Sequence, residues 1–223
     1  MNDLSRDVTG ISALGDDLRR KLYLFVSSQP SPVGREQAAS ALGIPAHQAK
    51  FHLDRLEEAG LLESEYARLT GRSGPGAGRP AKIYRRRSED FSVSLPDREY
   101  ALAGELMATA IDEATEKGTP VAGTLTRAAW NQGTNIGAAV TGPGSPLRLA
   151  AKALSAFGYE PRIEEGRLVM ANCPFRALAK THAKLVCEMN HALLEGVCDQ
   201  VGGLTASLEP GEGRCCVLLR ETA

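Results

Sequence analysis

Long apolar runs, a signal sequence and an excess of charge of one sign are all missing from this 223-residue chain. No segment approaches the roughly 18 apolar residues that a membrane span needs. The first ten residues, MNDLSRDVTG, lack the basic start and apolar stretch of a signal peptide. With 43% hydrophobic and 24% charged residues, the composition is that of an ordinary globular protein. We therefore expect a cytoplasmic location.

Cysteine is absent from the first 172 residues, and no two cysteines have the C-x-x-C spacing of common zinc knuckles. The five cysteines all follow that point, and their odd number leaves at least one thiol without a partner. In a reducing compartment such thiols rarely form a disulfide framework. A secreted domain stabilised by disulfides is therefore excluded, whereas free cysteine thiols remain candidates for metal binding or catalysis.

The net charge of −1 by itself argues against nucleic acid as a partner, but the charge is unevenly distributed. Seven basic and no acidic residues lie between positions 66 and 87: Arg68, Arg72, Arg79, Lys82, Arg85, Arg86 and Arg87. A segment of this charge can neutralise several phosphates even when the whole chain is close to neutral. The other interpretation is a solvated arginine-rich loop, and the segment before it favours DNA.

Two short helices are predicted around Gly43, over residues 34–42 and 46–60. Gly43 suits the left-handed end of the first helix, and Pro45 opens the second. The second helix has an apolar stripe of Ala46, Ala49, Leu53 and Leu56, opposite His47, Gln48, Lys50, Phe51 and Arg55. This pattern is typical of a helix-turn-helix whose second helix enters the major groove of DNA.

Two strands are predicted next, LLESEYARL and AKIYRRR, separated by the Gly- and Pro-rich segment TGRSGPGAGRP. A helix-turn-helix followed by a ribbon with a basic tip is a winged helix. Residues 33–87 resemble the ArsR/MarR-like winged-helix regulators, above all in AKFHLDRLEEAGLLE. We expect base contacts from the polar face of the second helix, and phosphate or minor-groove contacts from Arg72, Arg79 and Lys82.

The sequence after residue 95 predicts a helical region followed by a small α+β domain. Helices are expected over 97–117 and 120–138, the first with Leu102, Leu106, Ala110, Ile111 and Ala114 inward. They either form a dimer interface, as a two-fold operator favours, or simply pack together. After the linker TGPGSP we expect a helix, two strands turning at Glu165–Gly166, a helical segment broken near His182, and two closing strands. The fold class is mainly α with an α+β C-terminal domain, divided at 1–95, 96–140 and 141–223.

Helix and strand geometry limits which cysteines can share a site. Cys187 and Cys198 lie eleven residues apart, which is roughly 16 Å along a continuous helix, so they cannot bind one metal or small cluster. Cys215 and Cys216 are adjacent in an expected strand, and only one of them should face a shared site. Cys173 sits on a strand-to-helix turn. The candidates for a fourth ligand are His191, His182, Asn190 and a small exogenous thiol, and the alternative is that the cysteines are only small buried residues.

The segments NCPFRALAKTHAKLVCEMN and GRCC resemble the C-terminal domain of SufR-type regulators, winged-helix repressors that sense iron–sulfur status. The resemblance implies an iron–sulfur cluster held by Cys173, Cys187 and Cys215, which match the three cysteine ligands of that family. Cys216 is an addition that obscures which thiol of the pair is the ligand, and Cys198 has no assigned role. Thiolates also suit zinc, so the sequence leaves the metal open.

Together these features predict a homodimeric repressor, not an enzyme, whose binding to a double-stranded operator responds to the cluster. By resemblance its targets are iron–sulfur assembly genes. A first alternative keeps the winged helix but senses zinc or a small organic ligand. A second is an enzyme with Cys173 as nucleophile at a helix start. No oxyanion motif or oriented Cys–His pair accompanies Cys173, and such an enzyme has no use for a winged helix.

Overall fold

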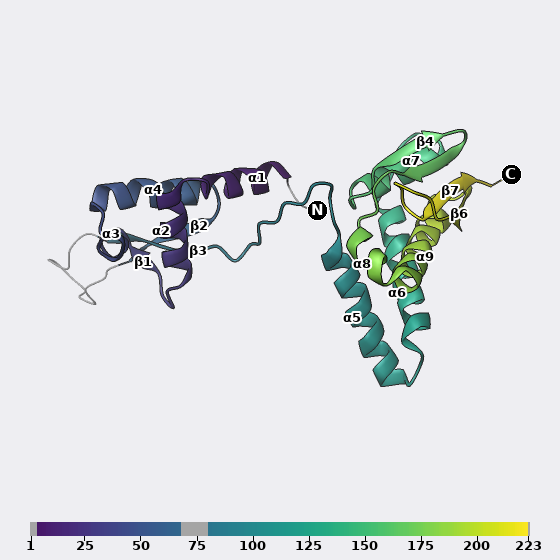
Figure 1. The fold of residues 1–223 in the computed structure, drawn as a ribbon, viewed down its shortest axis with the longest axis horizontal. Helices are drawn as coiled ribbons and strands as arrows, with labels where there is room; N and C mark the ends of the chain where they lie inside the picture. Colours follow the sequence, from purple (N-terminus) through teal and green to yellow (C-terminus); the bar gives the residue numbers. More distant parts are fainter. Residues whose placement is uncertain (1–3, 68–79, 223) are drawn as a thin grey trace. The chain divides into compact units, whose positions relative to one another are not determined.

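The computed structural model describes residues 4–67 and 80–222. The chain divides after Val93 into two compact units, each with a hydrophobic core of its own. Figure 1 shows the N-terminal unit in purple to blue and the C-terminal unit in teal to yellow. Within the described ranges, no helix is long and apolar enough to cross a membrane.

The N-terminal unit contains α2 (Asp17–Ser27), α3 (Arg35–Leu42) and α4 (Ala46–Glu58), and the last two match the helices expected around Gly43. Asp16 caps α2, since its carboxylate accepts the backbone N–H of Arg19 at 2.8 Å. Gly43 ends α3 with a φ of 66°, the left-handed conformation that the sequence predicts. The expected stripe of α4 is buried through Ala49, Leu53 and Leu56. The helix-turn-helix is therefore confirmed.

The sequence did not predict α1 (Leu4–Ala13). The buried residues of this helix are Asp7, Gly10 and Ala13, and its larger apolar side chains are exposed. The Asp7 carboxylate accepts hydrogen bonds from Arg6 and from the backbone N–H of Ser92. A helix that buries a carboxylate, a glycine and an alanine has no strong hydrophobic pattern to recognise.

A three-stranded antiparallel sheet completes the N-terminal unit, in the order β1 (Val33–Gly34), β3 (Ala81–Arg86), β2 (Leu62–Ala67). The β2–β3 ribbon pairs Leu62 with Arg86 at one end and Ala67 with Ala81 at the other. This is the ribbon of a winged helix, as expected. The third strand, β1, was not predicted, because two residues are too few to show an alternating pattern.

The C-terminal unit contains α5 (Tyr100–Lys117), α6 (Val121–Ala138), α7 (Pro146–Ser155), α8 (Arg176–Thr181) and α9 (Ala183–Val201). Figure 1 shows α5 and α6 as a long hairpin, with α9 beside α6. The expected break at His182 separates α8 from α9. Ile111 was expected to face inward and is instead 52% exposed, since α5 packs mainly on α6 and buries only one face.

A four-stranded antiparallel sheet lies in the same unit, in the order β4 (Pro161–Glu164), β5 (Arg167–Met170), β7 (Val217–Glu221), β6 (Leu204–Leu208). Glu165 and Gly166 form the expected turn, with φ values of 49° and 74°. The domain boundary expected at residue 140 places α5 and α6 outside the domain that contains this sheet. In the structure Leu106 and Ala129 share one core with Leu168 and Val217, because the side chains of the hairpin are buried together with those of the sheet and α9.

Candidate DNA-binding surface and thiol cluster

The outward face of α4 carries most of the expected DNA contacts. Lys50 and Phe51 are exposed, as are His47 and Arg55, whereas Gln48 is half-buried. The guanidinium of Arg55 lies 5.7 Å from the centre of the Phe51 ring. An exposed aromatic ring among three basic or titratable side chains is a surface that can contact base edges and phosphates.

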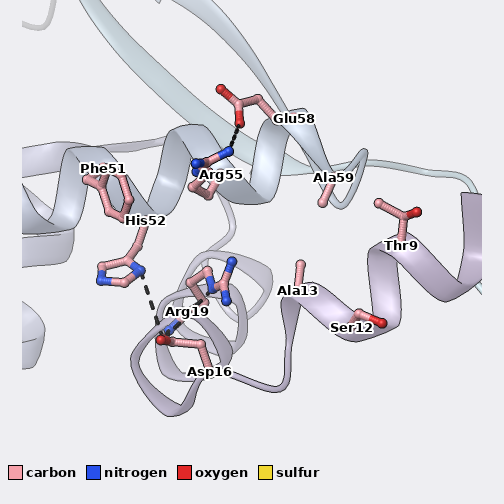
Figure 2. A pocket seen from close by; sticks show the side chains of 10 residues that line it. All are labelled: Thr9, Ser12, Ala13, Asp16, Arg19, Phe51, His52, Arg55, Glu58 and Ala59. Atoms are coloured by element: carbon pink, nitrogen blue, oxygen red, sulfur yellow. Dashed lines mark hydrogen bonds and ion pairs between the residues drawn. The ribbon is translucent and has the colours of Figure 1, made fainter.

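Beside this face, a pocket of about 500 Å³ lies among α1, α2 and α4 (Figure 2). Figure 2 shows Arg55 paired with Glu58 on α4, at 3.0 Å, and His52 directed towards Asp16 at 3.9 Å. Charged side chains of both signs line the pocket, together with the apolar Ala13, Phe51 and Ala59. Phe51 and Arg55 therefore belong both to this pocket and to the exposed face of α4.

Lys82, for which the sequence predicts a phosphate or minor-groove contact, is paired with carboxylates of α4 in the structure. Its Nζ lies 2.8 Å from Asp54 Oδ1 and 2.5 Å from Glu57 Oε2, so two carboxylates of α4 already neutralise it. Asp54 and Glu57 are three residues apart on one helix face, within reach of β3. Lys82 thus fastens the wing to the helix, a partnership between residues too distant in sequence to be predicted from the pattern.

Two other arginines of the basic segment are also paired with carboxylates. Arg85 pairs with Glu63 at 2.9 Å, and Arg87 pairs with Glu89 at 2.5 Å. Arg68, Arg72 and Arg79 lie outside the described residues. Their expected contacts with phosphate or the minor groove remain predictions.

Asp54 is the centre of the network between α4 and the wing, and its removal should destabilise the N-terminal unit. Its carboxylate accepts hydrogen bonds from Lys50 and Lys82, at 2.7 and 2.8 Å, and from Tyr84 at 2.7 Å. Burial alone raises the pKa of Asp54, but these hydrogen bonds outweigh it and lower the pKa from 3.8 to about 2. Because the pKa of Asp54 is lower in the folded than in the unfolded chain, its ionised carboxylate stabilises the fold by about 2 kcal/mol above about pH 4. This contribution is lost as the pH falls towards 2.

We therefore expect Asp54→Asn to lower the free energy of unfolding by about 2–3 kcal/mol at pH 7, measured by urea denaturation. The difference from the wild type should shrink below about pH 4. Asp17→Asn is the matched control, because Asp17 forms only exposed ion pairs, and it should change stability by less than about 0.5 kcal/mol. An equal effect of both substitutions would contradict the role given to Asp54.

Four of the five thiols gather at one place in the C-terminal unit. Cys173, Cys187 and Cys216 line one pocket. The pKa of Cys215 is lowered by the neighbouring thiols of Cys173 and Cys216, which places Cys215 beside them. Of the adjacent pair, Cys216 lines the pocket that opens onto the cluster, whereas Cys215 is 1% exposed and does not line it. Both residues precede β7, with a bend at Cys216. That only one of the two thiols serves as a ligand stays a prediction.

Hydrogen bonds single out Cys215 as the thiol that ionises most readily. Its pKa is lowered because Cys173 and Cys216 donate to its sulfur, as do the backbone N–H of Val217 and the amide of Asn190 at 3.2 Å. The pKa values of Cys173 and Cys216 are raised, first by their hydrogen bonds to Cys215 and then by burial. The cluster thus favours one thiolate at its centre with protonated thiols around it.

The other candidate ligands are placed differently. Asn190 is 1% exposed, and its Oδ1 accepts the hydroxyl of the buried Tyr159, so the amide orients Cys215 from behind. His191 points to β6, with Nε2 3.3 Å from the carbonyl oxygen of Ala206. His182 is exposed at the break between α8 and α9. Cys198 is buried and borders a separate pocket with Trp130 and Thr205.

A pocket of about 200 Å³ opens onto the cluster. Three thiols line it, Cys173, Cys187 and Cys216, together with the basic side chains of Arg176, Lys180 and Arg214. Within the parts of the chain that the structure describes, no three His, Cys, Asp or Glu side chains are arranged so that they could hold a single metal ion. The donor set still fits a thiophilic group by its chemistry, since the sulfurs can bind iron or zinc and the cations offset the charge of thiolates.

Comparison with known proteins gives one match, which lies in the N-terminal unit. Residues 14–65 match the family model of a helix-turn-helix domain, a range that runs from before α2 into β2. No curated protein and no solved structure matches the chain. The matched domain and the exposed face of α4 support a DNA-binding transcription regulator of the winged-helix type.

Proposed function

We propose that the chain is a homodimeric transcription repressor whose affinity for its operator depends on an iron–sulfur cluster held by cysteines of the C-terminal unit. The observation that carries this proposal is the gathering of four thiols beside a basic pocket, in the same chain as a helix-turn-helix. Cys173, Cys187 and Cys215 are the ligands that the sequence resemblance implies, and all three belong to that cluster.

The residues around the thiols suit an anionic, thiolate-bound centre. Asn190 and the backbone N–H of Val217 donate to Cys215, which favours its thiolate form. Arg176, Lys180 and Arg214 surround the opening with positive charge. When bound, the cluster would supply iron–sulfur chemistry that is sensitive to oxidants. The sulfurs now hydrogen-bond to one another, so binding replaces S–H protons and requires the thiols to separate.

The homodimer is proposed to form through the free face of α5. Exposed small or apolar residues follow this helix at spacings of three and four: Ala101, Gly104, Ala108, Ile111 and Thr115. A Cβ at Gly104 would meet no heavy atom within 4 Å, so nothing within the chain requires a glycine there. A second copy of α5 approaching closely would explain it, and a two-fold dimer matches a two-fold operator. Sedimentation equilibrium of the full chain tests this by its mass.

The decisive experiment combines metal content with DNA affinity. The full chain is purified anaerobically, iron, sulfide and zinc are quantified, and binding is measured on a DNA duplex selected from a random pool by the wild type. We expect iron and sulfide together, and roughly 10-fold tighter binding before than after removal of the cluster with a chelator. Cys173→Ser should bind like the stripped protein, and Cys198→Ser like the wild type. Equal affinity of loaded and stripped protein would contradict the switch.

The same measurements separate the alternatives. A colourless protein with bound zinc would favour zinc sensing by the same thiols, and a metal-free protein would favour a small organic ligand. Cysteine-dependent catalysis has less support. The hydrogen bond to Cys215, together with burial, raises the pKa of Cys173, whereas a nucleophilic cysteine needs a lowered one.

A further inference from the structure

We infer that Cys216 is the fourth ligand of the centre proposed above, so that the chain itself supplies four thiolates: Cys173, Cys187, Cys215 and Cys216. The inference rests on the proposed function. It departs from the three-cysteine pattern that the sequence resemblance implies, and it removes the need for a histidine or an exogenous thiol. Its evidence lies in the backbone before β7, the walls of the pocket and the positions of the other candidates.

The backbone before β7 places Cys216 on the wall of the pocket and Cys215 in the interior beside it. The N–H of Cys215 donates to the carbonyl oxygen of Met170 at 2.9 Å, and the carbonyl oxygen of Cys216 accepts the N–H of Glu209 at 2.6 Å. These bonds tie the pair to the end of β5 on one side and to the segment after β6 on the other. With a bend at Cys216, both sulfurs reach the cluster.

Cys216 is half-buried and accessible from the pocket. It lines the pocket with Cys173 and Cys187, whereas Cys215 is 1% exposed and lies behind them. A three-cysteine site would leave Cys216 as a half-buried thiol on the wall that it shares with Cys173 and Cys187. A thiol so placed competes effectively with any exogenous ligand, because it has no translational freedom to lose.

His191 and Asn190 have other partners, and His182 is exposed and does not line the pocket. His191 contacts Ala206 on β6, and Asn190 uses both ends of its amide, on Cys215 and Tyr159. The pocket also offers charge compensation for a fourth thiolate. Arg176, Lys180 and Arg214 line the wall that Cys216 shares, and Arg214 Nη1 lies 3.3 Å from the carbonyl oxygen of Cys215.

The test uses the full chain, purified anaerobically, and compares Cys216→Ser with Cys198→Ser. Two readouts are followed: the rate at which a chelator bleaches the visible absorption, and the change in the visible circular dichroism when a small thiol such as 2-mercaptoethanol is added. The wild type and Cys198→Ser should bleach slowly and ignore the thiol. Cys216→Ser should bleach at least about 10-fold faster and respond to the thiol, because one position is open.

A second variant, Cys216→Ala, guards against a general folding defect. Its thermal unfolding in the metal-free state should match that of the wild type, and the small thiol should restore slow bleaching by filling the open position. Cys216 variants that behave like the wild type in both readouts would overturn the inference and leave the proposed cluster intact. A wild-type protein without iron and sulfide would instead overturn the proposed function itself.

Discussion

Gly133→Ala is expected to destabilise the C-terminal unit by at least about 3 kcal/mol, the largest effect of any single methyl group that we expect in this chain. At this point α6 and α9 touch through their backbones. A Cβ on Gly133 would lie 1.9 Å from the carbonyl oxygen of Leu193, and one on Gly196 would lie 2.1 Å from that of Trp130. Rigid backbone atoms cannot rotate away as a flexible side chain can, so the two helices would have to separate.

Gly123→Ala is the matched control on the same helix. A Cβ at Gly123 would meet no heavy atom within 4 Å, and alanine has the higher helix propensity. Thermal and urea denaturation of the metal-free chains should therefore show Gly123→Ala unchanged or slightly stabilised and Gly133→Ala strongly destabilised. Similar stability of the two variants would mean that α6 and α9 do not cross at this contact.

Gly133→Ala should also reduce the amount of iron and sulfide that the chain binds. Helix α9 carries Cys187 and Asn190, and its crossing with α6 sets where those side chains lie relative to Cys173 and Cys215. A shift of α9 therefore moves one thiol out of the cluster. Iron and sulfide content, measured on whatever fraction of Gly133→Ala remains folded, should fall well below that of Gly123→Ala.

The second large effect is expected at the DNA surface. The double variant Lys50→Ala, Phe51→Ala should lose at least about 30-fold in affinity for the duplex selected by the wild type, since each specific base contact contributes about 1–3 kcal/mol. Both side chains are exposed in the N-terminal half of α4, the part of a recognition helix that meets base edges. Fluorescence anisotropy at fixed salt measures the loss.

Arg162→Ala is the control for charge, because Arg162 is an exposed basic residue of the C-terminal unit. It should leave the affinity within about twofold of the wild type. The double variant should lower the unfolding temperature only slightly, since Asp54 loses the hydrogen bond from the exposed Lys50 but keeps those from Lys82 and Tyr84. An unchanged affinity of the double variant would show that α4 is not the recognition helix.

Local signals correctly predicted most of the winged helix and one turn of the C-terminal sheet. Gly43 ends α3, Pro45 precedes α4, and Glu165–Gly166 form the turn between β4 and β5, because each feature depends on the backbone preferences of a few adjacent residues. The elements that the sequence missed lack such signals. Helix α1 buries a carboxylate and a glycine, and strand β1 has only two residues. The exposure of Ile111 was missed because a periodic pattern cannot tell how many faces of a helix are covered.

The sequence by itself determined the residue types that matter: a polar face on α4, a basic segment after it, and thiols confined to the last third of the chain. It also separated Cys187 from Cys198, because the rise of a helix is fixed by local geometry. Only the tertiary structure decided that Cys216 lines one pocket with Cys173 and Cys187 and that Lys82 forms an ion pair with Asp54. Those outcomes depend on contacts between residues far apart in the chain, and packing of the whole unit, not local preference, brings such residues together.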